Sequence, residues 1–188
     1  GVGNAQDVEN ALDPAVFAEA AVERVEHDVG EIDVLVCNGD ALDGKGAKSG
    51  GSELITGDRD EQVDMAAKCI SVFGAKKVYI IEGTPYHTGV EESWESVLAE
   101  KVGAEHFGAH EWLDVEGVVF DFRHHVGSSS IPHGRYTAPQ RAALWNMIWA
   151  EKGIQPNARV IVRSHVHYYT AAMDARRIVV TTPALQSY

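Results

Sequence analysis

An apolar run of strand length ends abruptly in Gly39-Asp40, and this junction constrains the fold more than any other feature of the sequence. Residues 32–37 are almost continuously apolar, as in a strand that is covered on both faces. Asn, Gly and Asp are common turn formers, so an isolated Asn38-Gly39-Asp40 would be read as a simple turn. In open α/β sheets, however, ligands bind at the carboxyl ends of strands. Asp40 is therefore a candidate functional residue.

Three later apolar runs end in the same way, and each is followed by histidine. The segments that follow them are Gly83-Thr-Pro-Tyr-His87, Arg123-His-His125 and Arg163-Ser-His-Val-His167. Histidines two residues apart point to the same side of an extended segment, whereas only one of two adjacent histidines can face a shared site. Without further support, pairs of core or surface histidines would be the commoner explanation. Four strand ends that converge on Asp and His indicate a metal site.

The periodicity of apolar residues predicts an α/β fold in a single domain of 188 residues. In the first half, helices are expected over 13–29, 58–73 and 91–102 and strands over 32–37 and 77–82, the order of a parallel sheet. Later strands are expected at 111–115 and 118–124, joined by a Glu116-Gly117 turn, and at 159–163, 168–173 and 177–182, with a helix at 140–152.

Charge and hydropathy exclude several classes of protein. The net charge of −12 argues against a sequence-independent binder of DNA or RNA, which needs a basic face. It does not exclude a phosphorylated substrate, because bound divalent cations would invert the local field. No apolar run approaches the roughly 18 residues of a membrane span, and we see no signal peptide. We therefore expect a soluble cytoplasmic protein with no membrane partner.

A long glycine-rich segment, residues 39–57, follows the first strand and shows no periodicity. Loops of this length in compact domains are usually functional or mobile. Its Gly39-x4-Gly44-Lys45 pattern is similar to a nucleotide-binding P-loop, but Gly46 stands in place of the Ser or Thr and no helix is expected to begin there. The metal site is the better interpretation.

These motifs resemble, in order and spacing, those of the calcineurin-like metallophosphoesterases: GD, GNH(D/E), a lone His and GHxH. The matching segments are Asn38-Gly-Asp40, the motif at Gly83, the histidines at 124–125 and Ser164-His-Val-His167. The resemblance covers nearly the whole chain and extends to the metallophosphatase-like proteins of bacteriophages. It implies a four-layer α/β/β/α sandwich with a binuclear centre of two divalent metal ions.

The resemblance also implies the ligands of the two ions. Asp40 would bridge them, His165 and either His124 or His125 would bind the second ion, and His167 would bind the first. Such mixed histidine and carboxylate ligands suit Mn, Fe or Zn, with Mg as an alternative, better than Ca. The choice between His124 and His125 stays open at this point.

The sequence departs from the family pattern in three ways, of which the mildest is Ser164 in place of the Gly of GHxH. Thr84 stands where the family has a bridging Asn, which makes it a candidate ligand, and His87 lies two residues later than the family's catalytic His. His87 is the candidate general acid, which would protonate the leaving oxygen or steady the phosphate. The alternative is that His87, rather than Thr84, replaces the missing Asn as a metal ligand. No Asp-x-His motif precedes Asp40. We therefore expect a fragment that lacks the first and last strands of the sandwich, or a degenerate relative.

The resulting hypothesis is a metallophosphoesterase that hydrolyses phosphate monoesters or diesters by means of a metal-bound hydroxide. Its partner would be a phosphate ester, with nucleotides and nucleic acids among the candidates, in the host cytoplasm if the gene is carried by a phage. The alternative is a catalytically degenerate metal-binding or structural module with the same fold. An upstream Asp-x-His in the parent reading frame would discriminate the two. The metal, the substrate class and the oligomeric state are left open.

Overall fold

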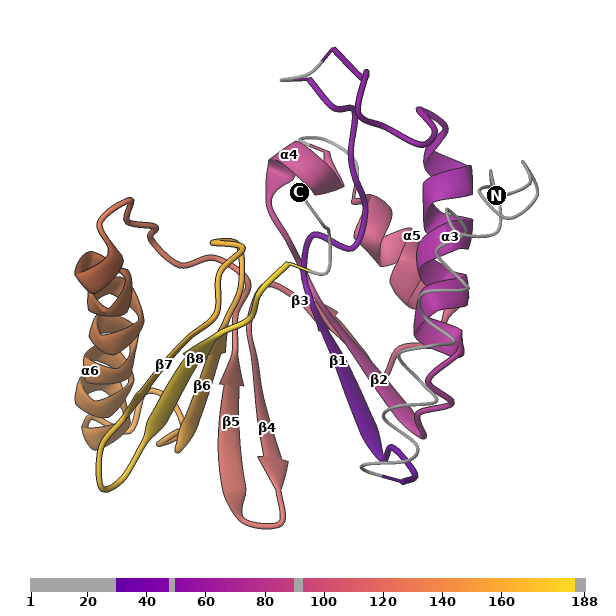
Figure 1. The fold of residues 1–188 in the computed structure, drawn as a ribbon. Coiled ribbons are helices and arrows are strands. Elements are labelled where there is room, and N and C mark those ends of the chain that lie inside the picture. Colours follow the sequence, from indigo (N-terminus) through magenta and orange to yellow (C-terminus); the bar gives the residue numbers. More distant parts are fainter. Residues whose placement is uncertain (1–29, 48–49, 90–92, 185–188) are drawn as a thin grey trace, which may run out of the picture. The chain divides into compact units, whose positions relative to one another are not determined.

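A computed structural model describes residues 30–47, 50–89 and 93–184 of the chain (Figure 1). The helix expected over residues 13–29 lies outside the described residues. The chain divides into two compact units. The first contains the described residues up to Cys37 together with Ala41–Ile80 and Tyr86–Phe107, and the second contains Asn38–Asp40, Ile81–Pro85 and the chain from Gly108 onward. The expectation that they form one domain stays a prediction.

The first unit is built on a three-stranded sheet with the order β1-β2-β3. Its strands are β1 (Val34–Asn38), β2 (Lys77–Ile81) and β3 (His106–Gly108), and its helices are α3 (Arg59–Ser71), the short α4 (Pro85–Thr88) and α5 (Trp94–Lys101). In Figure 1, α3 and α5 lie along the same sheet. The buried side chains of α3 and α5 pack with Ile80 of β2 and with Leu42 in one apolar core.

The second unit contains a five-stranded sheet with the order β4-β5-β6-β8-β7. The strands are β4 (Glu111–Val115), β5 (Val118–Phe122), β6 (Val160–Arg163), β7 (Thr170–Met173) and β8 (Ile178–Thr181). The central strands β5, β6 and β8 are parallel, and the edge strands β4 and β7 pair antiparallel with their neighbours. A 3-10 turn, η1 (Pro132–Tyr136), leads into α6 (Thr137–Glu151), which lies along this sheet (Figure 1). Ala142 and Ala143 of α6 pack on the buried cluster of Ala158, Ile161 and Val179.

Local sequence signals account for most of these boundaries. The Asp58 carboxylate caps α3 by accepting the backbone N–H groups of Asp60 at 2.8 Å and Glu61 at 3.2 Å. The expected hairpin turn is confirmed: Glu116 and Gly117 have φ angles of 50° and 81° between β4 and β5. Positive φ at both central residues is the geometry of a two-residue hairpin.

The α/β class is confirmed, with two sheets that each carry helices. The expected strands in the described residues are all present, each displaced by no more than two residues at either end. Helix α6 begins three residues earlier than expected, because Pro139 is tolerated in the first turn, where its missing N–H is not needed. The elements β3, α4 and η1 were not predicted, since they are too short to show periodicity. No helix in the described part of the chain is long and apolar enough to cross a membrane.

Candidate metal centre

Asp40, His124 and His165 meet in the second unit, where one ligand atom of each lies within 4.8 Å of the others. They follow strands β1, β5 and β6. Nε2 of His124 lies 2.8 Å and Nδ1 of His165 lies 4.0 Å from Oδ2 of Asp40. The two imidazole rings are edge to face, with centroids 5.4 Å apart. The arrangement offers two imidazole nitrogens and one carboxylate oxygen to a single ion.

A backbone carbonyl indicates which ring nitrogen of His124 carries a hydrogen. Its Nδ1 lies 2.7 Å from the carbonyl oxygen of Asn38, and a carbonyl only accepts, so Nδ1 carries a hydrogen. In a neutral imidazole, Nε2 would then direct a lone pair at the Asp40 carboxylate 2.8 Å away. Two lone pairs at that distance repel, so a proton or a metal cation must lie between them. Metal-binding histidines commonly donate their other N–H in this way.

Thr84 holds the second oxygen of the Asp40 carboxylate. Its backbone N–H and its hydroxyl donate to Oδ1 of Asp40 at 2.6 Å and 3.1 Å. These bonds orient the carboxylate so that Oδ2 faces the histidines. The structure therefore shows Thr84 as a residue that positions Asp40, and its role as a metal ligand stays a prediction.

His165 supplies a second nitrogen in the form that a metal requires. Its Nδ1 is buried and makes no hydrogen bond to a described residue. Burial lowers the pKa of His165, as do the neighbouring imidazoles of His125 and His124, against the opposite effect of Asp40. A lowered pKa favours the neutral ring, which is the form that binds a metal. A buried nitrogen with no hydrogen bond beside a carboxylate fits a site for a cation.

The backbone is strained at the same place. Asp40, His165 and His167 have φ angles of 55°, 68° and 59°, in the left-handed region that non-glycine residues rarely adopt. Such conformations cost about 1–3 kcal/mol each and cluster at functional sites. Among the described non-glycine residues, only Glu116 of the hairpin turn shares this feature. The strain is concentrated where the candidate ligands lie.

The other expected site residues lie outside this triad. His125 is exposed, and its ring centroid lies 4.8 Å from that of His165 in a tilted arrangement. His167 is also exposed. His87 belongs to the first unit, where its Nδ1 lies 2.9 Å and 3.1 Å from the carbonyl oxygens of Leu42 and Asp43. The roles expected for these three histidines stay predictions.

Two glycines allow the loops of the site to approach one another. A Cβ atom on Gly39, whose φ is 82°, would lie 2.6 Å from Nδ1 of His124 and 2.8 Å from Cα of Gly83. This close packing explains why glycine stands at position 39. A P-loop would also need a helix directly after Lys45, whereas the next helix in the described chain begins only at Arg59.

Sequence reasoning assigned no role to Asn38 beyond the motif. Its side-chain amide donates to Oγ of Ser164 at 2.8 Å, and this hydroxyl lies 2.8 Å from Oγ1 of Thr182. The Ser164 backbone N–H in turn donates to the carbonyl of His124. Asn38 and Ser164 thus join the segments that carry the three candidate ligands. The signal for both was their place at a strand end beside a candidate ligand.

A buried charged network supports β5 and β6 just before the candidate ligands. The Asp121 side chain, 1% exposed, lies 2.7 Å from Nη1 of Arg163 and 3.0 Å from Nε2 of His110. Burial by itself raises the pKa of Asp121, but the His110 hydrogen bond and the Arg163 charge outweigh it and hold the pKa below its usual value. Since Arg163 also donates to the Asp121 carbonyl, the network locks the two strands together.

No protein-family model matches the chain, and no curated protein matches it. The chain is similar in structure to a single mutant of Vps29 from Entamoeba histolytica, with 13% identity, 90% of this chain and 67% of that chain covered, and a TM-score of 0.44. A conserved uncharacterized protein from Streptococcus pneumoniae, described as a predicted phosphoesterase, has 10% identity, 92% and 67% coverage and a TM-score of 0.41. A protein of unknown function from Aquifex aeolicus has 13% identity, 85% and 70% coverage and a TM-score of 0.43. These are loose likenesses of the chain path.

Proposed function

We propose that this chain is a metal-dependent phosphoesterase in which Asp40, His124 and His165 bind a divalent ion. The observation that carries the proposal is the 2.8 Å contact between Nε2 of His124 and Oδ2 of Asp40, with the other nitrogen of His124 fixed as a donor. Such a contact needs either a proton or a metal cation at its two atoms, and we propose that a metal takes this position. The buried Nδ1 of His165 adds a third donor to the same position.

The donor set favours Mn, Fe or Zn, because imidazole nitrogens suit these ions better than they suit Ca. When bound, a divalent ion supplies positive charge to phosphoryl oxygens and makes a water molecule acidic enough to attack near neutral pH. Neighbouring residues hold the proposed metal ligands in place. Thr84 fixes the Asp40 carboxylate, and the Asn38 carbonyl orients His124.

We propose one ion at Asp40, His124 and His165. A second ion, as in the binuclear centre that the family resemblance implies, is the further part of this proposal. The described residues hold one cluster suited to a metal, and His167 is the expected ligand of a further ion. His87 is proposed as the general acid, as the family pattern implies. Nucleotides and other phosphate esters are the proposed substrates.

The second candidate function is a metal-binding module without catalysis. It is favoured by the hydroxyl of Thr84, which donates to Asp40 where the family has an Asn that binds metal. If Thr84 serves only to position Asp40, the centre has fewer ligands than an active phosphoesterase of this family would have.

Hydrolysis of p-nitrophenyl phosphate and bis-p-nitrophenyl phosphate with added manganese or zinc tests the proposal. Asp40→Asn is the informative variant, because its side-chain oxygen can still accept from Thr84 while the negative charge is lost. Asp43→Asn, an exposed position in the same loop, is the matched control. Hydrolysis by wild type and Asp43→Asn but not by Asp40→Asn supports a phosphoesterase. Metal binding without hydrolysis supports the second candidate, and equal rates in all three proteins contradict the first.

A further inference from the structure

Helix α6 is apolar on the side that points away from its sheet. Ala142 and Ala143 pack against the sheet, and Asn146 is buried on the same side. At about 100° per residue, Leu144 and Ile148 stand about 160° from Asn146, one on either side. Leu144 is 49% exposed, and in Figure 1 the sheet lies on one side of α6. A surface helix normally carries polar residues on its outer side, whereas a helix that is apolar all round is normally buried.

Two tryptophans extend this apolar surface along one flank of the helix. Trp145 is 49% exposed, and its ring is stacked on that of Trp149 with the centroids 5.9 Å apart and 18° between the planes. Nζ of Lys152 lies 4.9 Å from the centroid of the Trp149 ring. On the opposite flank, Met147 is 41% exposed. Tryptophan is enriched at the centres of protein interfaces, and rings that are already stacked lose little conformational entropy when an interface forms.

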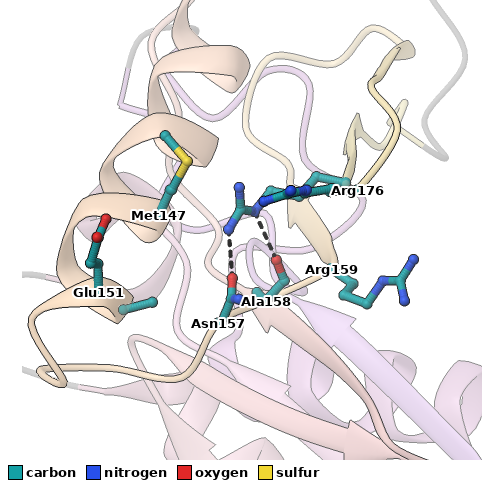
Figure 2. A pocket seen from close by; sticks show the side chains of 8 residues that line it. Met147, Glu151, Asn157, Ala158, Arg159 and Arg176 are labelled. Atoms are coloured by element: carbon teal, nitrogen blue, oxygen red, sulfur yellow. Dashed lines mark hydrogen bonds between the residues drawn. The ribbon is translucent and has the colours of Figure 1, made fainter.

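Two opposite charges stand at the ends of this surface. Arg141 and Glu151 lie five residues before and five residues after Asn146, so both point about 140° away from it. Both are exposed, and neither forms an ion pair with another described residue. In Figure 2, Glu151 projects from α6 and the dashed hydrogen bonds join other residues. The two charges are therefore available to a partner.

The surface is complementary to itself when two copies of α6 run antiparallel. A two-fold axis at the level of Asn146 reverses the order of residues along the helix. Arg141 of one copy then lies level with Glu151 of the other at both ends of the contact, and Leu144 lies level with Ile148. An apolar seam between charged positions is the usual pattern of two helices that pack along their length. A two-fold contact needs a surface that matches itself in this way.

We propose that the outer face of α6 is the interface between two copies of this chain, which pair antiparallel about a two-fold axis. The outer face consists of Arg141, Leu144, Trp145, Ile148 and Glu151. An anionic partner would be repelled by Glu151 and a cationic partner by Arg141, whereas a second copy pairs both charges. The exposed apolar surface is small for an interface, and the net charge of −12 opposes association. We therefore expect a weak dimer.

Sedimentation equilibrium of the 188-residue chain tests the proposal. The buffer contains EDTA, so that metal ions cannot bridge exposed histidines of two copies. As the concentration of wild type rises to about 1 mM, which is the range of weak association, the measured mass should move upward from 20.4 kDa toward twice that value.

Charge reversal at either end separates ion pairing from general repulsion. Arg141→Glu makes the chain more acidic and Glu151→Arg makes it less acidic, but each places like charges at both ends of the contact. Each should therefore weaken dimerisation at least about tenfold. General repulsion between acidic chains would give the two variants opposite effects. Lys68→Glu is the control for Arg141→Glu, because it makes the same change of charge at an exposed position of α3.

A 1:1 mixture of the two single variants tests the pairing itself. A chain with Arg141→Glu and a chain with Glu151→Arg have opposite charges at both ends of the contact. The mixture should therefore form a dimer at concentrations where neither variant does so alone. The double variant, which carries both changes in one chain, should also recover dimerisation. Damage to the fold would not be repaired by mixing.

Three outcomes would overturn the proposal. The first is a wild type that stays at 20.4 kDa over the whole range, which would leave this face to a partner of another kind. The second is dimerisation of both single variants as strong as that of wild type. The third is a 1:1 mixture that associates no more strongly than the separate variants.

Discussion

A Cβ atom on Gly83 would lie 2.3 Å from Oδ1 of Asp40 and 2.3 Å from its backbone nitrogen. No side chain fits at that distance, so the segment after β2 can hold the Asp40 carboxylate only if residue 83 is glycine. The requirement is steric, since φ of Gly83 is not in the left-handed region.

Gly83→Ala should therefore move Asp40 and weaken metal binding while the chain stays folded. Changes that disturb the support of a metal ligand typically cost about 10–100-fold in affinity. Isothermal titration with zinc would measure the loss, and circular dichroism would show that the helices persist. Gly57→Ala is the control, because a Cβ there meets no atom within 4 Å. Unchanged zinc affinity in Gly83→Ala would show that Asp40 is not a ligand.

Replacing His124 by alanine should change the metal content of the protein far more than replacing His125 by alanine. His124 is buried with Nε2 at Asp40, whereas His125 is exposed, so only His124→Ala should lose bound metal. Metal content after dialysis against manganese or zinc provides the measurement, and exposed His133→Ala serves as the reference. Metal loss in His125→Ala but not in His124→Ala would reverse the assignment.

This chain should bind about one divalent ion. Three protein ligands meet in one cluster of the described residues, which is the number that open metal sites usually have. Calorimetric titration with manganese or zinc gives the stoichiometry directly. Two tight sites per chain would mean that further residues complete a binuclear centre, with His167 as the first to replace.

Arg163→Met should destabilise the fold strongly at neutral pH, because it leaves the Asp121 carboxylate buried without its cation. Breaking such a buried pair costs about 3–5 kcal/mol. The loss should shrink in acid, where Asp121 takes up a proton and no longer needs the arginine. Urea unfolding of wild type and variant at neutral and acidic pH would measure the difference, and a loss independent of pH would contradict this account.

The same network sets how wild-type stability depends on pH. The folded state lowers the pKa of Asp121 from 3.8, so its contribution to stability is complete above that value. The contribution is lost as the pH falls through the lower pKa of the folded state. Replacing Asp121 with asparagine should therefore flatten the acidic part of the stability profile.

The elements that sequence predicted well are those with long periodic patterns. Helix α3 shows its Asp58 cap and its apolar face in the sequence, and the β4-β5 hairpin shows its Glu-Gly turn. The strand-end position of Asp40, His124 and His165 also follows from short-range signals, because each stands directly after an apolar run. What these positions bind stays a prediction.

The features that the sequence did not predict depend on contacts between residues that are distant in the chain. No local pattern distinguishes His124 from His125, since the choice depends on the carbonyl of Asn38 in another strand. Thr84 looked like a substitute ligand in sequence, and only the three-dimensional arrangement shows that it donates to Asp40. The buried Asp121 was hidden within an apolar strand, where its partners Arg163 and His110 could not be seen.

The chain passes between its two units five times, at Cys37, Asp40, Ile80, Pro85 and Phe107. Asp40 and Thr84 thus stand in short inserts that belong with the later histidines, although most of the sequence around them belongs to the first unit. A genetic crossover with a relative anywhere between Asp40 and His124 would combine a carboxylate from one parent with histidines from the other. After such a crossover, the three candidate ligands would fit one another only if both parents place these residues alike.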